Sequence, residues 1–179
     1  RRKVFMKKTV LGVLCLVFAL VMFASAAPFS NTIKVNLLGG IGVEYETKAP
    51  AGLSSTLGSI IKPLTKTTPK DQFTVVLGGR IGGGFGGSGA VRYYLEPSTM
   101  KGIFAQTGAY ALGAVVGSNF YLTTGISIEG GYKYVMDNGI TAEASAGLST
   151  GILSINSVTG LGFPIRPGFV FGVGVGYSW

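Results

Sequence analysis

The sequence contains no histidine and only one cysteine, and these shortages exclude much of enzyme chemistry. Without histidine there is neither a Ser-His-Asp triad nor an imidazole base. Cys15 lies in an apolar N-terminal run, so no disulfide and no Cys/His metal site is expected beyond it. Glu44 and Glu46 are a close carboxylate pair on one face of an extended segment, but this spacing alone does not indicate catalysis. We therefore predict no enzyme and no cofactor.

Charge and long apolar runs are also scarce. Only 12% of the residues are charged, and past residue 30 no apolar run reaches the roughly 20 residues that a membrane helix needs. The net charge is +8, but five basic residues precede residue 9, and ten basic against seven acidic residues follow. The remaining charge of +3 is too small and too dispersed to indicate a nucleic-acid partner. The five N-terminal residues are Arg1, Arg2, Lys3, Lys7 and Lys8.

The N-terminal segment has the three parts of a secretory signal peptide. Met6-Lys7-Lys8 is the charged region, residues 9–23 are the apolar region, and Ala24-Ser25-Ala26 is a small-residue cleavage site. We predict a signal peptide over residues 1–26, with residues 1–5 upstream of the true start, and one domain over residues 27–179. The alternative is an uncleaved membrane anchor.

After residue 30 the apolar residues alternate with a period of two, which is typical of β-strands. The last segment shows it best, since one face is bulky and apolar and the other is almost entirely glycine. A glycine face suits a crowded, narrow barrel interior. The first face holds Phe169, Phe171, Val173, Val175, Tyr177 and Trp179, and the second holds Gly168, Val170, Gly172, Gly174, Gly176 and Ser178.

Four segments end alike, in a short run that contains an aromatic residue, and aromatic residues collect at membrane interfaces. We interpret them as strands descending to one interface, with ascending strands near residues 31–38, 72–83, 102–116 and 139–153. This gives an all-β fold, a transmembrane antiparallel up-and-down barrel of eight strands. The four endings are Gly42–Glu46, Val91–Leu95, Gly131–Val135 and Gly176–Trp179.

One connection fits this plan poorly. Residues 47–71 are too many for a periplasmic turn, and they include three prolines. If this segment were an outer loop, six strands or an irregular count would follow. Within it, residues 53–64 have the composition of a short amphipathic helix that rests on the membrane or caps the barrel, and a flexible loop is the alternative.

Alternation also places nine charged residues on the inner face. Four are basic and five acidic, and in an interior just wide enough to be filled by side chains they should pair. We favour a salt-bridged plug over the alternative, a gated pore or proton path. The predicted lumen charge network is Lys34, Glu44, Glu46, Arg80, Arg92, Glu96, Glu129, Lys133 and Glu143.

The whole predicted mature chain resembles small outer-membrane β-barrel proteins of the OmpA-transmembrane-domain and OmpX type. The segments that carry the resemblance are Lys34–Leu37, Val43–Glu46, Arg92–Tyr94, Gly131–Tyr134 with Asn138-Gly139, and the terminal Tyr177-Ser178-Trp179. The resemblance implies that Tyr177 and Trp179 are the signal read by the barrel-assembly machinery, in which phenylalanine is the usual last residue.

From this pattern we expect a monomeric, integral protein of the bacterial cell outer membrane with a structural or envelope-integrity role. Its expected partners are outer-membrane lipids, the barrel-assembly machinery and periplasmic chaperones. A narrow, porin-like pore or carrier for small solutes is one alternative function, and surface adhesion or interaction is another.

Overall fold

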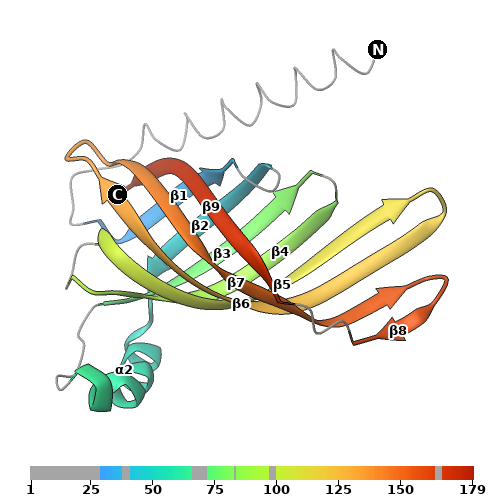
Figure 1. The fold of residues 1–179 in the computed structure, drawn as a ribbon. Helices are drawn as coiled ribbons and strands as arrows, with labels where there is room; N and C mark the ends of the chain where they lie inside the picture. The colour runs from blue at the N-terminus through green and yellow to red at the C-terminus, as the bar shows by residue number, and fades with distance from the viewer. Residues whose placement is uncertain (1–28, 38–40, 66–71, 83, 97–99, 164–166) are drawn as a thin grey trace, which may run out of the picture.

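The computed structural model describes residues 29–37, 41–65, 72–82, 84–96, 100–163 and 167–179. The predicted signal peptide lies outside these residues. Within them, nine strands and one helix follow one another along the chain (Figure 1). The strands are β1 (Asn31–Asn36), β2 (Ile41–Lys48), β3 (Phe73–Ile81), β4 (Phe85–Tyr94), β5 (Gly102–Val116), β6 (Asn119–Val135), β7 (Ile140–Asn156), β8 (Gly160–Gly162) and β9 (Pro167–Ser178).

Eight of these strands close into one antiparallel barrel. Each strand from β1 to β7 pairs with the next along the chain, β7 pairs with β9, and β9 pairs with β1. The short β8 pairs with β7 outside this ring. The predicted eight-stranded up-and-down barrel is therefore confirmed. We call the end where β9 finishes the C-terminal end, and the other end the outer end.

Side chains alternate between the inside and the outside of the barrel, apart from one register shift in the β6–β7 pairing at Thr124 and Gly125. On β9, Phe169 and Phe171 point outward and are 81% and 62% exposed, while the glycines between them face the lumen. These glycines leave room for inward side chains of neighbouring strands, since a Cβ on Gly174 would lie 2.7 Å from the Asn36 side-chain oxygen. The predicted apolar outer face and glycine inner face are both present.

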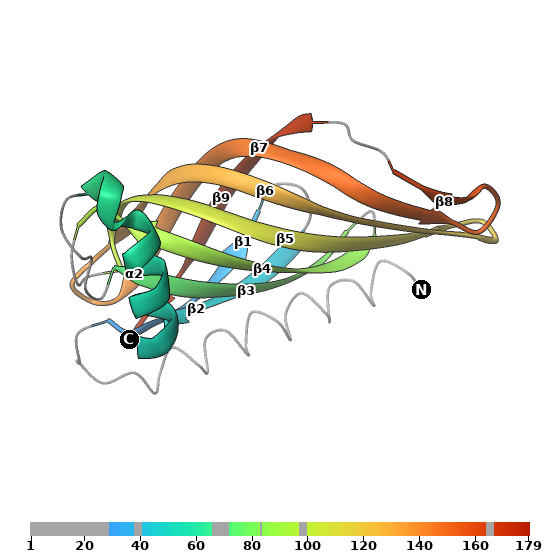
Figure 2. The ribbon, with the colours of Figure 1, turned by 90° about the horizontal axis from the view of Figure 1, so that it is seen from below.

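At the outer end, part of the sheet projects beyond the ring (Figures 1 and 2). The pairing of β4 with β5 stops at Gly113, whereas the β5–β6 pairing continues to Val116. β7 and β8 form a second hairpin beside it. Residues 155–167 include the end of β7, all of β8 and the first residue of β9.

The long connection between β2 and β3 contains the helix α2 (Ala51–Thr65). The helix lies at the C-terminal end, which is where an eight-stranded up-and-down barrel places the connection between β2 and β3. The alternative six-strand count is therefore wrong. Of the two predicted states of this segment, helix and flexible loop, the structure has the helix over residues 51–65. Among the described residues, no helix is both long enough and apolar enough to cross a membrane.

Adjacent glycines on β6 offer a test of how tightly the lumen is packed. A Cβ on Gly131, which faces inward, would lie 2.5 Å from the Phe104 ring and would also overlap the Ala144 carbonyl oxygen. At Gly130, which faces outward, the nearest atom to such a Cβ is 3.8 Å away.

We expect Gly131→Ala to lower the free energy of unfolding by about 1–3 kcal/mol through overpacking. Gly130→Ala should change it by about 0.5 kcal/mol or less, as measured by urea unfolding in detergent micelles. Equal effects of the two substitutions would contradict the tight lumen.

Candidate functional site

Six ionised side chains form a continuous chain of ion pairs across the lumen, and we call them the lumen charge cluster. Positive and negative groups alternate along it, and five of the eight barrel strands contribute. Three cations and three anions make the cluster neutral. In order, its members are Lys133, Glu46, Arg92, Glu143, Lys34 and Glu44.

Glu46 of β2 is completely buried and has all its partners inside the barrel. Its carboxylate lies 2.8 Å from the Lys133 ammonium nitrogen and 3.2 Å from the Arg92 guanidinium. It also accepts hydrogen bonds of 2.7 Å from the Thr74 hydroxyl and 2.8 Å from the Tyr94 hydroxyl. A buried carboxylate is tolerated when it is paired and hydrogen-bonded in this way.

Arg92 of β4 is the centre of the cluster. Its guanidinium donates two hydrogen bonds to Glu143, at 2.7 and 2.9 Å, in the bidentate arrangement that suits this group. Two further bonds reach the Gln106 side-chain oxygen, and the guanidinium lies 3.9 Å from the centre of the Phe104 ring. Arg92 therefore ties together β2, β4, β5 and β7.

The two lysines complete the cluster at its ends. Lys133 of β6 also donates a hydrogen bond of 2.6 Å to the Thr32 hydroxyl. Lys34 of β1 contacts Glu143 and lies 2.9 Å from Glu44. Glu44 in turn accepts a hydrogen bond from the Asn36 amide. Among the described residues, each member of the cluster has at least one partner of opposite charge.

Between the cluster and the C-terminal end the lumen is filled. Hydroxyl groups of Thr32, Ser178 and Thr141 form a hydrogen-bonded row, with oxygen separations of 2.7 and 2.8 Å, and all three are buried. Beside this row, the buried side chains of Tyr94, Met100 and Phe104 pack together. The C-terminal half of the lumen is therefore closed by polar and apolar side chains together.

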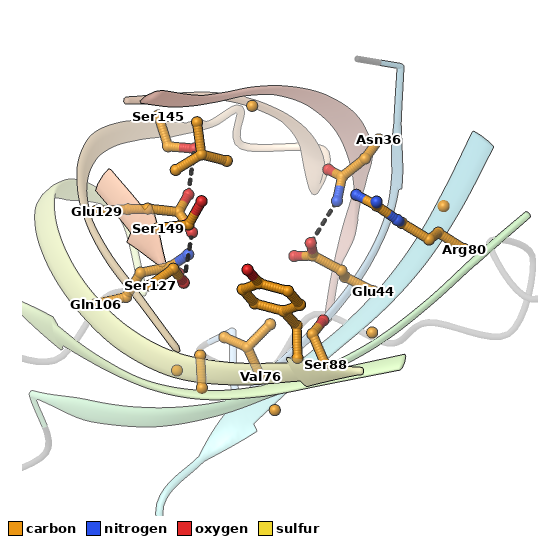
Figure 3. A pocket seen from close by; sticks show the side chains of 18 of the residues that line it. Asn36, Glu44, Val76, Arg80, Ser88, Gln106, Ser127, Glu129, Ser145 and Ser149 are labelled. Carbon is orange, nitrogen blue, oxygen red and sulfur yellow. Dashed lines mark hydrogen bonds between the residues drawn. The ribbon is translucent and has the colours of Figure 1, made fainter. Parts of the chain in front are cut away.

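On the other side of the cluster the lumen widens into a chamber of about 300 Å³ that we call the outer chamber (Figure 3). Its wall combines glycine and apolar residues with charged and hydroxyl-bearing side chains. Glu129 accepts hydrogen bonds of 3.1 Å from the Ser127 and Ser145 hydroxyls. Arg80 extends from the opposite side of the chamber toward Asn36. The cluster thus separates a filled half of the lumen from a partly open one.

The structure brings six of the nine predicted network residues into the cluster and leaves three outside it. Arg80 and Glu129 line the outer chamber. Glu96 lies beyond β4, which ends at Tyr94, and its side chain is exposed. The correction has a simple cause: the strand ends two residues earlier than the alternation suggested, so Glu96 does not continue the inner face.

Sequence reasoning left the neutral groups that complete the cluster out of the predicted network. They lie on the same inner faces as the charges, two residues away along the strand in several cases, so the period of two could have found them. Tyr94 was grouped with the aromatic residues of the membrane interface, but its hydroxyl points inward to Glu46. The residues left out are Thr32, Thr74, Tyr94, Gln106, Thr141 and Ser178.

The charges of this arrangement balance one another. Every charge in the cluster is paired, and the described residues include no group of three His, Cys, Asp or Glu that could hold a metal ion. No family model matches the chain, and no curated protein and no solved structure is significantly similar to it. The functional argument therefore depends on the barrel's own residues.

Proposed function

We propose that the protein is an integral outer-membrane barrel with a structural or envelope-integrity role, closed to solutes by the lumen charge cluster. One observation carries this proposal: the barrel is apolar outside and charged inside. Water-soluble proteins arrange these groups the other way round. Transmembrane barrels have an apolar outer band and a polar interior.

The outer band is continuous around the barrel. Large apolar side chains are exposed on the outer face of every ring strand except β1, where Ile33 and Val35 are half-buried. This surface is far beyond the patches that soluble monomers expose. A strand crosses a bilayer with about 9–11 residues, and every ring strand from β3 onward has nine or more. Examples around the ring are Leu77, Phe85, Ile103, Ile128, Leu148, Phe171 and Val175.

Aromatic side chains gather at the C-terminal end of this band. Tyr45, Tyr132 and Tyr134 point outward and are exposed, and the Tyr45 ring lies 6.5 Å from the Trp179 ring. Such residues are typical of the membrane–water interface. This supports an OmpX-like plan, with Tyr177 and Trp179 as the assembly signal and with the assembly machinery, periplasmic chaperones and outer-membrane lipids as partners. We propose a monomer without catalytic activity.

The closed lumen distinguishes this proposal from a narrow pore. Because the cluster and the residues below it fill the interior, the wild-type protein in planar lipid bilayers is expected to give no stable conductance steps. Replacing Arg92 and Glu143 together by alanine removes the central pair and leaves two balanced pairs, Lys133 with Glu46 and Lys34 with Glu44. This double variant, with Tyr94→Ala and Phe104→Ala added to open the filled half of the lumen below the cluster, is expected to conduct.

A matched double substitution controls for the loss of two charges. Lys101 and Asp137 are exposed at the C-terminal end and lie outside the lumen. The double variant Lys101→Ala with Asp137→Ala should therefore give no conductance steps. Stable, reproducible channels formed by the wild-type protein would reject the closed lumen and favour the pore.

The projecting hairpins favour surface interaction as a second candidate function. β6 and β7 have 17 residues each, more than a bilayer requires. Three apolar side chains near their tip are exposed, with fractions of 67% for Val158, 60% for Leu161 and 70% for Phe163. β8 also has no partner on its other edge among the described strands.

Hydrophobic adhesion tests this second function. Cells that display the wild-type protein are expected to adhere to polystyrene more strongly than cells displaying Val158→Ser, Leu161→Ser and Phe163→Ser together. Immunoblotting of isolated membranes must first show equal amounts of the two proteins. Equal adhesion at equal amounts would exclude a contribution from the hairpins.

A further inference from the structure

The helix α2 has two chemically different sides. Leu53, Leu57 and Ile60 recur every three to four residues and share one side. Ser55, Ser59 and Lys62 lie on the opposite side. In water, a helix of this kind normally packs its apolar side against the rest of the protein.

The described part of the barrel covers this apolar side only in part, since Leu53 and Leu57 are half-buried. Ile60 is 66% exposed, although α2 is attached firmly to the strands next to it. The Ala49 N–H donates to the Phe73 carbonyl oxygen, and the Ser54 hydroxyl donates to the Ala49 carbonyl oxygen. The start of the helix is therefore held beside β3, while its apolar surface still lacks a complete protein partner.

The position of α2 is consistent with a membrane surface. It lies outside the ring of strands at the C-terminal end, beside the barrel wall and not across the lumen (Figures 1 and 2). Figure 2 shows its axis running across the direction of the strands. If the strands cross a bilayer, α2 runs along the plane of that bilayer, next to the aromatic end of the apolar band.

The charge of this segment suits an anionic surface. Residues 47–71 contain four lysines and only one acidic residue, Asp71. Phospholipid leaflets that contain phosphatidylglycerol are anionic, and lysines near such a surface are attracted to its phosphates. Interfacial helices combine an apolar side with lysine on the polar side. The lysines are Lys48, Lys62, Lys66 and Lys70.

We propose that α2 is an interfacial lipid-binding helix that lies in the periplasmic leaflet of the outer membrane. Leu53, Leu57 and Ile60 enter the boundary between headgroups and acyl chains, and Lys62 faces the aqueous phosphate layer. This inference rests on the proposed outer-membrane location. It goes beyond that location because it assigns to the β2–β3 connection a lipid partner that the barrel strands do not need.

Site-specific fluorescence tests the inference. Residues 27–179 contain no cysteine, so Ile60→Cys and Ser59→Cys each provide one attachment point for the polarity-sensitive fluorophore NBD. The proteins are refolded into vesicles of phosphatidylethanolamine and phosphatidylglycerol, with or without bromine on the acyl chains. At position 60 we expect a blue-shifted emission that brominated lipid quenches, and at position 59 the unshifted, unquenched emission of an aqueous probe.

Leu57→Cys and Ser55→Cys provide a second pair, in case the change at Ile60 disturbs the helix, and should give the same contrast. Heat-modifiable gel mobility shows in each sample whether the barrel has inserted. If the barrel inserts but the probes at positions 57 and 60 are not quenched, the inference about α2 is wrong and the proposed location still holds. A blue shift without quenching would show that protein, such as a second copy, covers α2, and it would also overturn the inference. A barrel that does not insert contradicts the proposed function instead.

Discussion

Replacing Arg92 with methionine is expected to lower the free energy of unfolding by about 3–5 kcal/mol, the usual effect of breaking a buried ion pair on one side. Arg92 has no exposed surface, and its removal leaves Glu46 and Glu143 with fewer positive partners in the closed half of the lumen. The Gln106 side-chain oxygen also loses two hydrogen bonds. Urea unfolding of the refolded protein in detergent micelles measures the change.

Two further variants show whether the loss of stability comes from breaking the cluster or from removing any lumen arginine. Arg80 also faces the lumen but lines the open outer chamber, so Arg80→Met should change the free energy of unfolding by about 0.5 kcal/mol or less. Adding Glu46→Gln to Arg92→Met restores the balance of charge, with two cations and two anions left in the cluster. The double variant should therefore be more stable than additivity predicts. If Arg92→Met and Arg80→Met have the same effect, the cluster does not stabilise the barrel.

Placing an arginine at Ile128 is expected to lower the free energy of unfolding in phospholipid vesicles by about 2–4 kcal/mol, as for charges on the lipid face near the bilayer midplane. Ile128 points outward from the middle of β6, with Thr107 and Leu148 as its neighbours on β5 and β7. Urea titration of vesicle-inserted protein, followed by its gel mobility, measures the loss.

Val158 provides the matched control, since its side chain is 67% exposed and that of Ile128 is 66% exposed. It lies in the turn between β7 and β8, beyond the apolar band, so Val158→Arg should cost only about 0–1 kcal/mol. In a water-soluble barrel, both substitutions would fall within about 0.5 kcal/mol of the wild-type stability. Equal, small effects at the two positions would therefore contradict a lipid-facing surface.

Much of the fold could be predicted because a barrel strand alternates between two environments. The predicted strand over residues 102–116 coincides with β5. Which face of this strand points into the lumen could not be predicted, since both faces are apolar. The structure buries Phe104 inside and exposes Ile103 outside. The helix was left open because the composition of residues 53–64 fits both a helix and a loop. The projecting hairpins were missed because a period of two does not show how far a strand extends beyond the ring.

The members of the cluster could be predicted but their pairing could not. Alternation gives the inner face of each strand, whereas pairing depends on the stagger between strands and on reach across the lumen. Arg92 meets Glu143, which lies 51 residues away in the sequence, and no local signal indicates that contact. The extent of the plug also depends on neutral partners such as Thr32 and Tyr94, which charge counting ignores.

The location of the barrel is the central claim, and cell fractionation tests it most directly. After expression of the full chain in a Gram-negative host, membranes are separated on a sucrose gradient, and the protein is run on gels with and without boiling. We expect it in the outer-membrane fraction, resistant to carbonate extraction, with a faster mobility when unboiled. Recovery as a soluble periplasmic protein whose mobility does not change on boiling would contradict the account.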